Sequence, residues 1–126
     1  MKALEDLDVH LKNRARELEK FKEEGRKIIG CYPGGYVPEE IILACDAIPV
    51  SLHRGGEHEP VLIAGAYLPR WYDTFIRSQI GFKVLRGEPV YDLMDLFVIP
   101  ITDNNVRILG DAWEFYHLGE IFRFGV

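Results

Sequence analysis

The sequence is poor in cysteine and contains no long hydrophobic run. Only Cys31 and Cys45 occur among 126 residues, which is too few for the disulfide framework of a small secreted module. No window approaches the roughly 18 consecutive apolar residues that a membrane span requires. The first residues, MKALEDLDVH, lack the apolar core and the small-residue cleavage site of a secretory signal. We therefore expect a cytoplasmic protein.

An excess of positive charge and the common catalytic motifs are also missing. The formal net charge is -5 and the pI is about 5.3, which opposes binding to nucleic-acid phosphates. The sequence contains no Walker loop, no GxGxxG and no Ser/His/Asp order, so nucleotide hydrolysis, dinucleotide binding and nucleophilic hydrolysis have no positive support. We expect neither a nucleic-acid nor a membrane partner.

The first 26 residues predict one long amphipathic helix. Apolar side chains recur at helical spacing and nearly follow a heptad, although Arg14 falls where another apolar residue would belong. These apolar positions are Leu4, Leu7, Leu11, Leu18 and Phe21. Such a stripe packs on its own domain in most proteins, and self-association is the alternative. We treat residues 1–26 as a segment distinct from the domain that follows.

Residues 27–126 alternate between strand and helix signals. Strands are expected at 27–31, 48–52, 95–101 and 120–125, and helices at 38–46, at 61–82 with a break near Pro69, and at 103–117. We expect a polar loop at 53–60 and a turn-rich connection at 85–92. Parallel strands need crossover helices, and these cover both sheet faces. The sequence predicts an α/β protein, a single Rossmann-like three-layer domain with about four mostly parallel strands after the N-terminal helix.

Three motifs resemble those of one family. They are GGYVPEEIILACDAIPVSL at 34–52, IRSQIG at 76–81 and DLFVIPITD at 95–103. In this order they resemble the D-components of 2-hydroxyacyl-CoA dehydratases and benzoyl-CoA reductases, whose motif glutamate corresponds to Glu40. The resemblance covers residues from about 25 to 126 and implies the first of the family's two Rossmann-like lobes.

The resemblance implies an iron-sulfur cluster whose ligand positions are changed here. Catalytic family members hold a [4Fe-4S] cluster on three cysteines, and an ATP-hydrolysing activator reduces it. Asp73 and Thr102 occupy the two ligand positions expected in this lobe. Hard oxygen donors do not replace thiolates, and Cys31 with Cys45 would leave a cluster under-coordinated. We expect no cluster and no other cofactor.

The same motifs supply candidate substrate-binding residues, each with a structural alternative. These candidates are Gly34, Gly35, Tyr36, Glu40, Arg77 and Ser78. Glu40 either belongs to a thioester site or stabilises the first turn of a helix. The glycine turn either binds an anion through its N–H groups or only reverses the chain. Arg77 and Ser78 either border the site or lie on a solvated helix face.

Other clusters favour structural roles. Cys31, Cys45, His53 and His58 have the spacing C-x13-C-x7-H-x4-H, which is not that of a structural zinc site. Trp71, Tyr72, Trp113, Phe115 and Tyr116 are expected in the core. We identify no catalytic residue and no metal site.

The sequence favours a non-catalytic accessory or acyl-CoA-binding protein, with no intrinsic activity. The alternative is a subunit of a 2-hydroxyacyl-CoA dehydratase-type lyase whose cluster is supplied by a separate partner chain. A third interpretation is a gene remnant that still folds. We expect a homo-oligomer, specifically a homodimer, or association with a related D-component chain.

Overall fold

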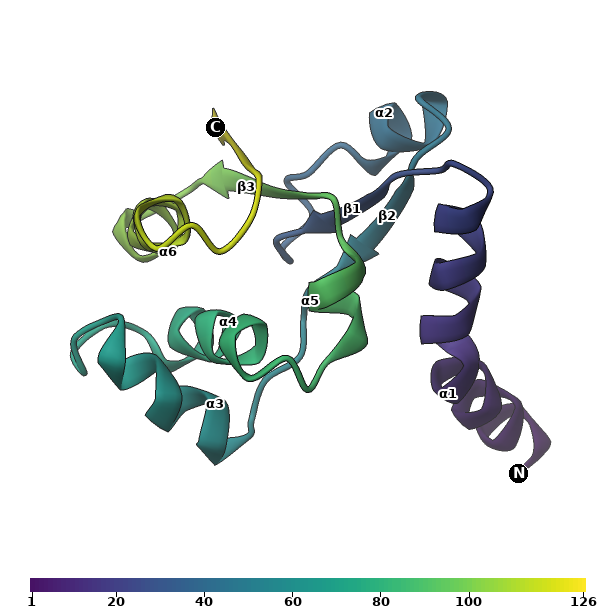
Figure 1. Cartoon of the computed structure of the whole chain (residues 1–126), viewed down its shortest axis with the longest axis horizontal. Coiled ribbons are helices and arrows are strands. Elements are labelled where there is room, and N and C mark those ends of the chain that lie inside the picture. The colour runs from purple at the N-terminus through teal and green to yellow at the C-terminus, as the bar shows by residue number, and fades with distance from the viewer.

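A four-stranded, all-parallel sheet forms the centre of the protein in a computed structural model that describes residues 1–126 (Figure 1). The strands are β1 (Ile28–Cys31), β2 (Ile48–Ser51), β3 (Leu96–Ile101) and β4 (Ile121–Gly125), and their order in space is β2-β1-β3-β4. Strand order therefore reverses between β1 and β3. The predicted α/β class and parallel sheet are confirmed.

The helices cover the two faces of the sheet unequally. They are α1 (Lys2–Glu23), α2 (Glu39–Ala44), α3 (His58–Ile63), α4 (Thr74–Leu85), α5 (Pro89–Leu93) and α6 (Asn104–Phe115), with a 3-10 turn at Ala64–Ala66. The β1-to-β2 crossover runs in the opposite direction to the later crossovers. Because parallel crossovers are right-handed, α2 lies on one face while α4 and α6 lie on the other. The three-layer prediction is confirmed.

The main hydrophobic core lies between the sheet and the α4 and α6 layer. Phe97 and Ile99 point from β3 into this layer and are fully buried. The ring of Phe97 packs against Trp113 of α6, with 4.8 Å between ring centroids. A smaller cluster of Cys31, Val37 and Val98 lies on the α2 face. The large side chains buried between the sheet and the α4 and α6 layer supply most of the apolar stabilisation.

The long helix α1 touches the body only through its second half. Leu18 is the one fully buried residue of α1, and it packs on Ile28 of β1 and Ile48 of β2. Residues 1–13 are all exposed, and this half of α1 extends away from the body in Figure 1. Asp95 attaches the second half of α1 to β1. Its carboxylate accepts hydrogen bonds from the backbone N–H of Ile28 in β1 at 2.8 Å and from Lys22 Nζ in α1 at 3.2 Å.

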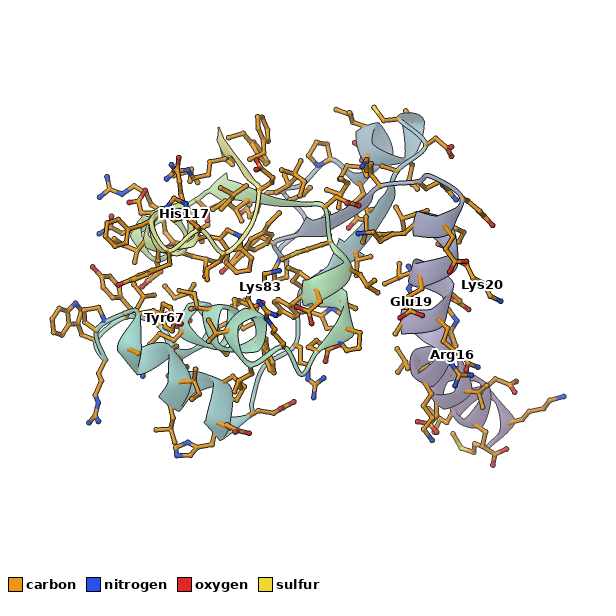
Figure 2. The ribbon with its side chains drawn as sticks, viewed as in Figure 1. Arg16, Glu19, Lys20, Tyr67, Lys83 and His117 are labelled. Carbon is orange, nitrogen blue, oxygen red and sulfur yellow. The ribbon has the colours of Figure 1, made fainter.

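One short helix begins earlier than predicted, and a second short helix was not predicted. The predicted loop 53–60 is wrong at its end, since α3 begins at His58 and buries Pro60 in its first turn, where a missing N–H does no harm. The predicted connection 85–92 contains α5, which begins with Pro89 and buries Tyr91. Lys83, central in Figure 2, holds α5 on α4 by donating to the Tyr91 carbonyl at 2.7 Å. Helices of six and five residues are too short to show helical periodicity.

None of the helices combines the length and the apolar character needed to cross a bilayer.

The expected break near Pro69 is present, and it is longer than the sequence indicated, because no helix covers residues 67–73. The observed α3 and α4 therefore replace one interrupted helix at 61–82.

Candidate functional site

The carboxyl ends of β1 and β3 lie side by side where the strand order reverses. In open α/β sheets this is the place where ligands bind, because the loops that follow the two strands diverge to opposite faces. We use the name switch-point edge for the residues gathered here: Tyr32 after β1, Thr102, Asp103 and Asn105 after β3, and Asp73 and Phe75 at the start of α4.

Two aspartates cap the helices that begin at the switch-point edge. Asp103 Oδ1 accepts from the backbone N–H groups of Asn105 at 2.7 Å and Val106 at 3.1 Å. Asp73 Oδ1 accepts in the same way from Phe75 at 2.8 Å and Ile76 at 3.4 Å. Each side chain satisfies N–H groups that have no partner within the helix. Both carboxylates are thus held by helix starts.

The two capped helix starts adjoin each other and the loop after β1. The backbone N–H of Asp73 donates to Asn105 Oδ1 at 3.4 Å, and Thr102 Oγ1 donates to Asp103 Oδ2 at 3.2 Å. The ring of Tyr32 meets Phe75 edge to face, with 6.0 Å between centroids. Residues 32, 73 and 102–105 therefore converge, although they are far apart in sequence.

Burial and the charge of this edge both raise the pKa of Tyr32. Burial raises the pKa of the Tyr32 hydroxyl, and the carboxylates of Asp103 and Asp73 raise it further because they oppose a phenolate. Tyr32 therefore remains a neutral hydroxyl that can donate a hydrogen bond. The switch-point edge offers hydroxyl donors and carboxylate acceptors.

This donor set does not fit a [4Fe-4S] cluster. Oxygen atoms stand at Asp73 and Thr102, whereas the irons of such clusters are held by thiolates. The nearest thiol, Cys31 at the end of β1, is 1% exposed, and burial, then Glu39, raises its pKa to about 11. Cys45 follows α2 and precedes the amino end of β2, at the opposite edge of the sheet. Neither cysteine replaces the expected ligands.

Three of the predicted substrate-binding residues lie on the segment between β1 and α2, and a fourth, Glu40, lies in the first turn of α2. Gly34 and Gly35 have φ angles of 121° and 78°, which favour glycine. Tyr36 is exposed, and Glu40 is exposed in the first turn of α2. The amide N–H groups of Gly34 and Gly35 donate to no backbone carbonyl. This exposed turn borders the switch-point edge through Tyr32.

Arg77 and Ser78 lie inside α4, and each donates a side-chain hydrogen bond to a backbone carbonyl of the domain, while the buried Arg77 Nε has no partner. Arg77 Nη2 donates to the Val61 carbonyl at 3.0 Å, while Ser78 Oγ donates to the Phe75 carbonyl at 2.6 Å. A Cβ atom on Gly81 would lie 2.0 Å from the Pro60 carbonyl oxygen. The IRSQIG segment therefore docks α3 on α4. The expectation that Arg77 lies on a solvated face is wrong, since it is buried.

The aromatic residues divide between core and surface. Trp113 is buried as expected, but Trp71 is 81% exposed, Phe115 is 74% exposed and Tyr116 is 39% exposed, so the core prediction is wrong for these three. Tyr67, labelled in Figure 2 below His117, meets Tyr116 with 4.9 Å between ring centroids.

No group of three or more His, Cys, Asp or Glu side chains is placed to hold a metal ion.

Sequence reasoning missed Tyr32, Phe75 and Asn105. A polar residue directly after a buried strand was the available signal for Tyr32. The contact between Tyr32 and Phe75 depends on the order of the strands in the sheet, and that order cannot be read from the sequence.

Comparison with protein-family models identifies a family for most of the chain. Residues 35–126 match the family model described as 2-hydroxyglutaryl-CoA dehydratase, D-component. The matched segment begins in the glycine turn after β1 and includes every strand except β1. No curated protein matches the chain.

Proposed function

Because the chain belongs to the 2-hydroxyglutaryl-CoA dehydratase D-component family, we propose that it binds an acyl thioester at the switch-point edge as a non-catalytic, cluster-free protein. The observation that carries the proposal is the juxtaposition of Asp73 with the start of α6, where oxygen donors replace the expected thiolates. The edge keeps the family's architecture and carries different side-chain chemistry.

The thioester carbonyl requires hydrogen-bond donors, and this edge has them. The Tyr32 hydroxyl stays protonated beside Asp73 and Asp103, and the N–H groups of Gly34 and Gly35 are without backbone acceptors. A neutral carbonyl oxygen accepts from such groups without any change in charge. We therefore assign the acyl end of the ligand to the space between Tyr32 and the glycine turn.

The phosphates of a coenzyme A ester would bind away from this edge. The helix starts here carry the carboxylates of Glu39, Glu40, Asp73 and Asp103. Carboxylates already occupy the N–H groups of α4 and α6 that would otherwise attract an anion. Recognition of the thioester thus depends on its acyl and carbonyl portion.

Calorimetric titration with a truncated thioester tests this assignment. An acyl-N-acetylcysteamine thioester lacks the nucleotide and its phosphates, so we expect it to bind about as well as the matching acyl-CoA. Tyr32→Phe removes one donor and should weaken binding about 2- to 10-fold. Tyr116→Phe, at the end of α6, is the matched control and should bind as the unchanged protein does.

Two results would contradict the proposal. One is the absence of binding heat with every thioester. The other is equal binding of free coenzyme A and acyl-CoA, which would place recognition in the nucleotide. An iron-containing complex obtained by anaerobic co-purification with a cysteine-bearing D-component would instead support a role as a subunit of a dehydratase-type lyase.

A further inference from the structure

The exposed half of α1 carries an apolar stripe with no partner in its own chain. Leu4, Leu7 and Leu11 are 59%, 51% and 63% exposed. They share a helix face with Leu18, because residues at these spacings lie above one another. Leu18 is packed on the body, whereas the first three leucines extend beyond it. One continuous stripe is therefore covered at one end and uncovered at the other.

The first half of α1, residues 1–13, gains little stability from packing within its own chain. All residues from 1 to 13 are exposed, and isolated helices shorter than about 12–15 residues are marginal in water. Most helix stability in proteins comes from packing of the apolar face. A surface that covers the leucines would therefore stabilise the first three turns of α1.

A groove of about 900 Å³ lies beside the end of this stripe. Leu11, Arg14 and Ala15 of α1 form one wall, and residues of β2, the loop after it and the start of α5 form the other, with Leu52 and Val90 among them. The groove also contains Lys12 and Arg54. It continues the leucine stripe toward the body and has room for side chains from another helix.

The charges along α1 favour a second α1 helix as the partner of the leucine stripe. Glu5, Asp6 and Asp8 lie in the first part of the helix, while Lys12, Arg14 and Arg16 follow without an intervening acid. A second α1 laid antiparallel, with its centre near Val9, sets Glu5 and Asp6 of each helix beside Lys12 and Arg14 of the other. A parallel arrangement would set like charges together, which destabilises a helix pair.

We propose that the protein is a homodimer in which the first halves of two α1 helices pack antiparallel through Leu4, Leu7 and Leu11. Leu7 of each protomer faces Leu11 of its partner, and each helix start reaches the groove beside Ala15 of the other protomer. The two bodies lie at opposite ends of the helix pair. This interface does not depend on the thioester site.

A single charged substitution in the stripe tests the interface, with a matched control on the same helix. Leu7→Glu should convert the dimer to a monomer in sedimentation velocity measurements. Val9 is similarly exposed, at 57%, and lies about 160° around the helix from both Leu7 and Leu11. Val9→Glu should remain a dimer. A monomeric unchanged protein, or a dimeric Leu7→Glu variant, would overturn the proposal.

Distances between spin labels test the direction of the helices. In a Cys45→Ser background, labels at Lys2→Cys should be offset by about 20 Å along the helix axis in the antiparallel pair, at 1.5 Å per residue. A parallel pair would hold the same labels across an interaxial distance of about 8–10 Å. The shorter distance in a dimer would refute the antiparallel arrangement.

Discussion

The backbone N–H of Asp73 donates to the side-chain oxygen of Asn105 at 3.4 Å, and this contact joins the starts of α4 and α6. Each helix start carries its own aspartate cap, at Asp73 and Asp103. The family resemblance assigns a thiolate to position 73, and the observed carboxylate instead stabilises a helix. A side chain with a local structural role therefore stands where the family's chemistry would be.

Removing the Asp73 cap should destabilise the fold. Asp73→Ala leaves the N–H groups of Phe75 and Ile76 without their acceptor, so the free energy of unfolding should fall by about 1 kcal/mol. Asp73→Asn keeps an acceptor oxygen and should cost much less. Urea unfolding measures both changes. An alanine variant as stable as the unchanged protein would show that the cap does not contribute.

The close approach of α3 and α4 should not tolerate a side chain at position 81. A Cβ atom at Gly81 would lie 2.0 Å from the Pro60 carbonyl oxygen, and backbone cannot move aside as a flexible side chain can. We expect Gly81→Ala to lower the free energy of unfolding by about 1–3 kcal/mol or more. Gly65→Ala is the control, since its Cβ would meet no atom within 4 Å. Equal stability of the two variants would contradict this packing.

The Asp95 carboxylate should give a stability contribution that depends on pH. Burial raises its pKa, but the hydrogen bonds from the Ile28 N–H and from Lys22 outweigh burial, and the net pKa is lowered. A carboxyl whose folded pKa is lowered stabilises the fold above its ordinary pKa, and that stabilisation disappears as the pH falls through the folded value.

Asp95→Asn should therefore cost about 1–3 kcal/mol at neutral pH, toward the lower end because the side chain is partly exposed. The difference from the unchanged protein should shrink in acid. Glu120→Gln is the control, because it replaces an exposed carboxylate that makes no hydrogen bond or ion pair. The measurement is the free energy of unfolding at several pH values. If Asp95→Asn differs from the unchanged protein by the same amount at acidic and neutral pH, the hydrogen bonds to the ionised Asp95 do not stabilise the fold.

The two cysteines should differ strongly in reactivity. Cys31 is buried with a pKa of about 11, whereas Cys45 is exposed. The thiolate is the reactive form, so alkylation near neutral pH should modify one thiol quickly and the other slowly. Cys45→Ser should abolish the fast phase. Fast labelling in that variant would mean that Cys31 is accessible.

Much of the fold could be predicted from local patterns. Short apolar runs identified all four strands, and the acidic N-terminal turn after Pro38 identified α2. By contrast, α3 and α5 depend on the burial of Pro60 and Tyr91, which tertiary packing provides. The limit was the length of these helices, which is too small for a periodic pattern.

Less of the site could be predicted, because it is assembled by strand order. Positions 73 and 102 were identified through the family resemblance, but their approach to Tyr32 requires β1 and β3 to be neighbours. The burial of Arg77 was also not predicted, since the contact between α3 and α4, where Arg77 donates to the Val61 carbonyl, forms only on folding. Charged side chains are exposed in most sequence contexts.

Anaerobic reconstitution with iron and sulfide, followed by iron analysis and Mössbauer spectroscopy, tests the central claim most directly. The claim is that this chain keeps the D-component fold with oxygen donors, rather than thiolates, at the switch-point edge. We predict no stoichiometric iron and no cluster signal in the folded protein. About four irons per chain with a [4Fe-4S] spectrum would contradict the account.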